Sequence, residues 1–239
     1  AALYHDNLGT PLESENFKKI VDFMQEIPGT NGRGKVLPGI DNMKKASNRT
    51  LAGENGMKFV EWLTNYLKGF FDFVIVDMGS SLNSGPHKGA LRTADKILVI
   101  VTPDLNSMGD AFSSIHSNII PDFGIDPSRF NLVYNCYNSE IAIPITEAAK
   151  KIGITALAQI PNDPTYSMTK CSNSGISYFS RFSPRTDNPT EINNSLNGLV
   201  ELAGHFYPPV IVAWSAMMND KSNPKKAKSG GLFSAFVRK

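Results

Sequence analysis

Short apolar runs alternate with longer segments of helical periodicity along this chain of 239 residues. The first two runs, residues 71–76 and 97–102, lack a regular alternation of polar and apolar positions, which is typical of strands covered on both faces. Breakers such as Gly, Pro and Asn bound the runs. The runs of strand length are residues 71–76, 97–102, 130–134 and 156–160, with a weaker one at 35–37.

The segments between these runs have the spacing of amphipathic helices. In residues 54–69, Met57, Val60 and Leu67 fall on one stripe, and the periodicity ends at a glycine. Similar patterns predict helices over residues 106–119, 141–152 and 191–206. Strands that alternate with helices favour right-handed crossovers. We therefore predict an α/β fold with a mainly parallel sheet and helices on both faces.

The last part of the chain has a different composition. A short apolar stretch follows Pro208 and Pro209, and a polar, lysine-containing linker then covers residues 219–231. We expect one α/β domain over residues 1–213 and a flexible basic tail over residues 214–239. The tail ends in apolar residues that would share one side of a two-turn helix: Leu232, Phe233, Phe236 and Val237.

Composition narrows the class of protein. Charged residues make up 19% of the chain and the formal net charge is +2, so nucleic acid is not an expected partner. No apolar run reaches the roughly 18 residues needed to span a bilayer. Cys136 and Cys171 are expected to be free thiols, and the four histidines lack the spacing of a zinc site. These features favour a cytoplasmic location.

Polar residues follow each of the four stronger runs. Asp77, Thr102, Asn135 and Asp163 stand in that order at the predicted strand ends. The carboxyl ends of parallel strands meet at one edge of a sheet, where α/β proteins bind ligands. Asp77 alone fits equally well as a capping residue at a strand-to-loop turn. The four together predict a binding site.

These segments resemble a known family. Residues 71–81, 94–104 and 160–164, with Asn135 between them, look like the ParA/MinD class of deviant P-loop ATPases. The sequences of these motifs are most similar to those of its CpaE/TadZ branch, which positions pilus assembly machinery in bacteria. The resemblance covers roughly residues 30–206 and rests on the order and spacing of the motifs. It implies a Rossmann-like P-loop NTPase core, ATP and Mg²⁺ as cofactors, and a homodimer.

The resemblance also implies a role for each matching residue. Asp77 would be the catalytic, Walker B-like carboxylate that contacts Mg²⁺ through water. Gly79 and Ser80 would lie in the loop that senses the γ-phosphate, and Asn135 would bind the adenine edge. The remaining nucleotide-binding residues would be Thr102 and Pro103 on one side, with Pro161 and Asp163 flanking the base.

The family's phosphate-binding loop has no good counterpart in this chain. Residues 29–35 match the pattern G-x-x-x-x-G-K, but Val36 follows where a Mg²⁺-binding Ser or Thr is required. No apolar strand precedes this segment, and Pro38 would break a following helix. We interpret it as a Gly-rich turn before a short strand. We expect the phosphate loop in an N-terminal segment outside this chain, with a degenerate, non-hydrolysing relative as the second interpretation.

Three functions are consistent with these observations. The first is a ParA/MinD-like ATPase that acts as a positioning or assembly switch, with this chain carrying the switch and adenine side of the site. The second is a non-catalytic scaffold or docking protein of a pilus or secretion assembly. The missing loop favours it, as does Met78-Gly79-Ser80 where relatives often carry a Pro pair. A DNA-partitioning ATPase ranks last because positive charge outside the tail is dispersed.

The basic tail is a separate candidate for function. Its lysines and Arg238 flank the apolar residues, and each basic residue near an anionic lipid surface adds about 1 kcal/mol of attraction. MinD-like proteins end in a short amphipathic helix that inserts into the bilayer surface, so the resemblance implies a peripheral position at the inner face of the cell membrane. A contact with a partner protein and a purely solubilising tail are the alternatives.

Overall fold

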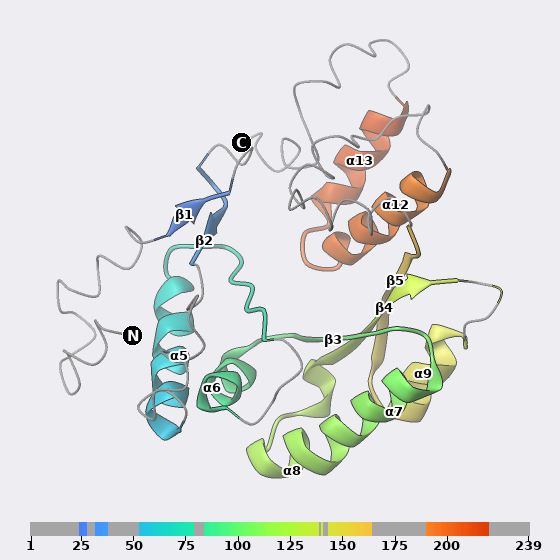
Figure 1. The fold of residues 1–239 in the computed structure, drawn as a ribbon. Helices are drawn as coiled ribbons and strands as arrows, with labels where there is room; N and C mark the ends of the chain where they lie inside the picture. Colours follow the sequence, from blue (N-terminus) through green and yellow to red (C-terminus); the bar gives the residue numbers. More distant parts are fainter. Residues whose placement is uncertain are drawn as a thin grey trace. The chain divides into compact units, whose positions relative to one another are not determined.

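The computed structural model describes residues 24–27, 32–37, 53–78, 84–138, 140, 143–163 and 190–219 (Figure 1). The chain divides into two compact units. The first comprises Ala1–Gln25, Lys35–Ile97 and Pro121–Ile125, and the second comprises Glu26–Gly34, Leu98–Ile120 and Asp126–Lys239.

Two helices pack against each other in the first unit. Helix α5 (Glu54–Leu67) buries Gly56, Thr64 and Leu67, and it confirms the helix predicted over residues 54–69. Helix α6 (Gly85–Thr93) carries Pro86 in its first turn, where a missing N–H is tolerated. The sequence pattern does not predict α6, because its two glycines lower its intrinsic helix propensity.

The glycines of α6 are what allow it to pack on α5. A Cβ atom at Gly85 would lie 1.9 Å from the backbone oxygen of Gly53, and one at Gly89 would lie 2.3 Å from that of Met57. The two helix backbones therefore approach more closely than side chains would permit. Tertiary packing outweighs the poor propensity of this segment.

The second unit is built on a three-stranded sheet in the order β3–β4–β5. The strands are β3 (Ile97–Val101), β4 (Phe130–Tyr137) and β5 (Thr155–Pro161). The sheet is parallel, and Asn131 and Leu132 of β4 lie opposite Thr155 and Ala156 of β5. The strands predicted over residues 97–102, 130–134 and 156–160 are confirmed, and so is the α/β fold class.

Helices lie on both sides of this sheet (Figure 1). After β3 the chain forms α7 (Leu105–Ser113), the π-helical turn η2 (Ser114–Ile119), α8 (Ile120–Phe123) and the 3-10 turn η3 (Pro127–Arg129). On the same side as α7, α9 (Ile145–Ile152) connects β4 to β5, and α12 (Thr190–Gly204) packs on β5 from the other side.

The helical predictions over residues 106–119 and 191–206 are confirmed. The helix predicted over residues 141–152 begins only at Ile145, directly after Pro144, which is its N-cap. It ends where Gly153 adopts the left-handed conformation with φ of 78°, a position that favours glycine.

A further helix, α13 (Pro209–Asn219), forms where the sequence indicates only a short apolar stretch. Proline occupies its first position, and Val210 and Trp214, one turn apart, are buried. The Trp214 indole N–H donates to the Oδ1 of Asn197 on α12 at 2.8 Å. The helix continues past residue 213, so the expected domain boundary falls inside it, and the division into domain and tail stays a prediction.

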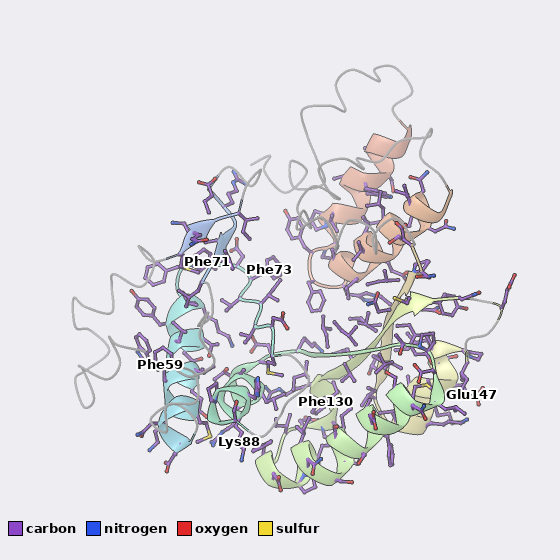
Figure 2. All side chains as sticks on the ribbon, viewed as in Figure 1. Phe59, Phe71, Phe73, Lys88, Phe130 and Glu147 are labelled. Atoms are coloured by element: carbon purple, nitrogen blue, oxygen red, sulfur yellow. The ribbon has the colours of Figure 1, made fainter. Side chains whose placement is uncertain are left out.

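The predicted strand over residues 71–76 is wrong. These residues adopt no regular secondary structure, and Phe73, Ile75 and Val76 are 53%, 92% and 44% exposed. Figure 2 labels Phe71 and Phe73 on this segment. A strand exists only through hydrogen bonds to a neighbouring strand, and no strand in the described part of the chain pairs with this segment. Its apolar sequence alone does not make it a strand.

We expect Gly89→Ala to lower the free energy of unfolding by about 1–3 kcal/mol, because the new methyl group would overlap the Met57 carbonyl. Urea denaturation followed by circular dichroism measures this change. Gly109→Ala on α7 is the matched control, since no atom lies within 4 Å of a Cβ there. That control should gain about 0.5–1 kcal/mol from helix propensity. Equal effects of the two substitutions would contradict the close packing of α6 on α5.

Candidate functional site

The carboxyl ends of three neighbouring parallel strands meet at one edge of the sheet in the second unit. Thr102 directly follows β3, Asn135 lies near the end of β4, and Pro161 ends β5. The structure therefore brings these sequence-predicted residues to the same edge. Asp163 is two residues beyond β5 and is 5% exposed, so its carboxyl group is held within the protein.

Thr102 takes part in the turn between β3 and α7. Asp104 is the N-cap of α7, and its Oδ1 accepts from the backbone N–H of Ser107 at 2.9 Å. The Thr102 hydroxyl donates to the other oxygen of the same carboxylate, and the Thr102 backbone N–H donates to the Ser107 hydroxyl at 3.2 Å. Pro103 is half-buried and lies between Thr102 and Asp104. This network fixes the start of α7 at the sheet edge.

The bonds from the Ser107 backbone N–H and then from the Thr102 hydroxyl lower the pKa of Asp104 below its ordinary value, because both favour the ionised carboxylate. Asp104 is exposed, so its charge is largely solvated. Its role in the structure is that of a cap.

The end of β4 is irregular. The pairing of Tyr134 with Gln159 and the pairing of Tyr137 with Pro161 are separated by a register shift. Cys136, inside the shift, has φ of 58°, and its backbone N–H donates to the Oδ1 of Asn135 at 3.0 Å. The sequence analysis singled out Asn135 but did not find the bulge at Cys136. Positive φ is typical of glycine, so a cysteine in that conformation gives no sequence signal of a bulge.

The bulge is followed at once by a link between β4 and the loop after β5. The backbone N–H of Asn162 donates to the Tyr137 carbonyl at 2.9 Å. Tyr134, before the bulge, is fully buried, and its hydroxyl donates to the sulfur of Met108 at 3.3 Å. Asn135 is thus half-buried between two anchored tyrosines.

Asp77 lies outside the unit that contains this sheet. It belongs to the first unit, whereas the strand ends belong to the second. It follows the irregular segment 71–76 and is exposed. The predicted position at the end of a buried strand is therefore wrong for the structure as described, while its catalytic role stays a prediction.

Gly32 and Arg33, in the described part of the Gly-rich segment before Val36, form a turn. Strands β1 (Gln25–Glu26) and β2 (Lys35–Val36) form a two-stranded sheet, and the Ile27 N–H donates to the Gly34 carbonyl at 2.9 Å. The Gly32 N–H donates to the Oε1 of Glu26 at 2.7 Å. The Gly32 N–H is thus already bonded to the Glu26 carboxylate, whereas a phosphate-binding loop would leave such an N–H free for its ligand. The interpretation as a Gly-rich turn before a short strand is confirmed for the described residues.

Several predicted residues lie outside the described part of the chain: Gly79, Ser80, Cys171, Leu232, Phe233, Phe236 and Val237. Their expected roles stay predictions. Cys136 is a free, exposed thiol. Among the described residues, no cluster of three or more His, Cys, Asp or Glu could hold a metal ion, and no helix is long and apolar enough to cross a membrane.

The arrangement at the sheet edge combines neutral polar groups with the carboxyl groups of Asp104 and Asp163. Asn135 offers amide donors, the Thr102 region offers backbone and hydroxyl groups, and Pro161 offers an apolar surface. Such a set suits the planar, hydrogen-bonding surface of a heterocyclic base.

Comparisons with known proteins agree with this architecture. The septum site-determining protein MinD of Thermotoga maritima is 23% identical over 111 residues, which are 44% of this chain and 39% of that protein. The structure of the MinD cell division protein of Aquifex aeolicus superposes with a TM-score of 0.50 at 17% identity, covering 82% of this chain and 77% of that one. No protein-family model matches the chain. The chain therefore has a ParA/MinD-type fold, and the match to the Thermotoga protein spans well under two thirds of its length.

We expect Asp104→Ala to lower the free energy of unfolding at pH 7, because it removes the cap of α7. The folded-state pKa of Asp104 is lowered, so its stabilising effect is complete above the ordinary value of 3.8 and is lost as the pH falls through the folded-state pKa. Urea titrations at pH 7 and at about pH 3 should show the gap between wild type and variant narrowing in acid. Asp110→Ala, at an exposed site on the same helix, is the control. A gap of the same size at both pH values would contradict this role.

Proposed function

We propose that this chain is part of a ParA/MinD-type ATPase that acts as a positioning or assembly switch, and that it carries the adenine side of the nucleotide site. The observation that carries the proposal is the edge formed by β3, β4 and β5, where Asn135 stands between Thr102 and Pro161 on a MinD-like fold. In this class of protein ATP joins two subunits and hydrolysis releases them, so we also propose a homodimer.

The described residues fit the base of ATP better than its phosphates. Asn135 is half-buried at the strand end and offers amide groups to a base, whereas the Gly32 amide is already bonded to Glu26. ATP, when bound, supplies the phosphoryl group whose cleavage resets the switch. Asp77 would orient water on Mg²⁺, and a phosphate loop would come from outside the described residues.

A non-catalytic scaffold of a pilus or secretion assembly is the second candidate. The sequence Met78-Gly79-Ser80 favours it, because relatives often carry a Pro pair at this point. The two candidates differ in their response to ATP. A switch dimerises with ATP and dissociates after hydrolysis, whereas a scaffold forms the same dimer with and without nucleotide.

We expect Asn135→Ala to weaken binding of Mg·ATP by about three- to tenfold, the effect of losing one neutral hydrogen bond to the base. Isothermal titration calorimetry on the full product of the gene measures this change. Asn118→Ala, at an exposed site on η2, is the matched control and should bind as wild type does. If the Asn135 variant binds Mg·ATP with wild-type affinity, the proposal that this chain carries the adenine side of the nucleotide site is wrong.

We expect Asp77→Ala to reduce ATP turnover to background in the full gene product, because no other group would orient the water on Mg²⁺. Release of phosphate under saturating Mg·ATP measures this loss. Asp72→Ala, an exposed carboxylate on the same segment, should leave turnover unchanged. Unchanged turnover in the Asp77 variant would exclude it as the catalytic carboxylate, and absent turnover in the wild type would favour the scaffold.

A further inference from the structure

One side of helix α7, in the second unit, exposes large apolar side chains. Leu105 and Phe112 are 74% and 47% exposed, and they lie about two helical turns apart on the same side of the helix. Gly109 lies between them, and a Cβ atom there would contact nothing outside the helix backbone within 4 Å. We call these three residues the α7 face. It is an apolar surface with open space at its centre.

The α7 face continues toward helix α9. The ring centroids of Phe112 and His116, one turn apart, are separated by 4.6 Å, and the Nε2 of His116 is hydrogen-bonded to the Ile152 carbonyl at the end of α9. On α9, Lys151 is paired with Glu147 at 3.0 Å, and Lys150 is the one further charged residue of that helix.

The charges along α7 itself are all acidic. Residues 98–120, which include α7 and η2, contain Asp104 and Asp110 and neither Lys nor Arg. Both carboxylates are exposed, and each is next in sequence to a residue of the α7 face. A partner that is both apolar and basic therefore matches this helix, because it would cover the apolar side chains and bring cations to within a Debye length of the carboxylates.

The last 20 residues of this chain have those two properties. They hold six of the 24 Lys and Arg residues and one of the 22 Asp and Glu residues, which leaves 18 basic and 21 acidic residues in the rest of the chain. The tail is thus cationic, and the remainder carries a net charge of −3. At its end, Leu232, Phe233, Phe236 and Val237 recur at the spacing of one helix side.

The lengths of the segments are compatible with docking. Residues 232–239 would form a helix of about 12 Å, close to the roughly 10 Å between Leu105 and Phe112 along α7. Helix α13 ends at Asn219, so residues 220–231 form a connection that spans up to about 40 Å. Helices α7 and α12 lie on opposite sides of the sheet (Figure 1). Crossing a sheet with a helix layer on each side requires about 20 Å, so the connection is long enough.

Helix α13 offers a second apolar surface near the tail. Ile211 and Val212 are 46% and 72% exposed. Residues 209–219 contain no charged side chain, so this helix provides no counter-charge for the six cations of the tail. The charge pattern therefore favours α7 over α13.

We propose that residues 232–239 dock as a short amphipathic helix on the α7 face of their own chain, with an aromatic side chain over Gly109. An isolated helix of eight residues is marginal in water, so folding of this segment is coupled to its docking. The interaction is independent of the proposed function, because it uses neither the nucleotide site nor a dimer. While it is docked, the apolar side of the tail is covered by α7.

Hydrogen–deuterium exchange of the full chain, followed by mass spectrometry, tests this contact. We expect the amides of residues 232–239 to exchange about tenfold more slowly in the wild type than in Leu105→Ser, because the variant loses an apolar contact with the tail. Phe112→Ser, at the other end of the face, should have the same effect. Val212→Ser, an equally exposed site on α13, is the matched control and should exchange as the wild type does. Unchanged exchange in β4 verifies that each variant is folded.

Four results would overturn the inference. Exchange of residues 232–239 at the rate of an unstructured chain in the wild type would show that the tail is not docked. Slow exchange that Val212→Ser abolishes and Leu105→Ser preserves would place the tail on α13. Slow exchange that disappears on dilution would assign the tail to a second copy of the chain. Protection that develops only with phosphatidylglycerol vesicles would make a lipid surface the partner of the tail.

Discussion

The burial of β4 is the constraint on which the second unit depends. Phe130, Leu132, Val133 and Tyr134 are all 0% exposed, so this strand must be covered on both faces and paired on both edges. Burying each such side chain contributes about 1.5–3 kcal/mol, and the buried backbone groups need partners as well. The neighbours β3 and β5 supply those partners, and the helices supply the cover.

The glycines at the helix contacts follow from the same demand for close cover. A Cβ at Gly198 of α12 would lie 2.5 Å from the backbone oxygen of Gln159, so only glycine lets this helix approach β5. The face of α9 toward the sheet carries small and aliphatic residues, of which Ala148, Ala149 and Ile152 are buried. At the C-terminal end of α9, the carbonyl of Ile152 is hydrogen-bonded to the Nε2 of His116 on η2. For β4, this cover leaves its carboxyl end, where Asn135 and Cys136 lie, as the accessible part of the strand.

The regular, buried part of β4 supports an irregular conformation at the carboxyl end of the strand. The anchored Tyr134 and Tyr137 enclose the bulge at Asn135 and Cys136, and a conformation that costs about 1–2 kcal/mol is tolerated there. The segment 71–76 shows the opposite case. All of its residues except Asp72 are apolar, yet Ile75 is 92% exposed, because no neighbouring strand in the described part of the chain pairs with it. Whether a segment joins a sheet depends on the strands beside it as much as on its own sequence.

Local sequence patterns were enough to predict the elements whose own residues have a clear apolar or helical periodicity. β3, β4, β5, α5 and α12 follow from apolar runs and helical stripes, and the polar residues at the strand ends follow from the breakers after them. Three features depend on tertiary contacts. Helix α6 packs on α5 through Gly85 and Gly89, and α13 packs on α12, where Trp214 is buried and donates to Asn197. The third is the positive φ of Cys136, which lies between two anchored tyrosines. Local patterns report propensity and burial. They do not show which other segment of the backbone packs against a given element. The conformations of α6, α13 and Cys136 depend on such contacts.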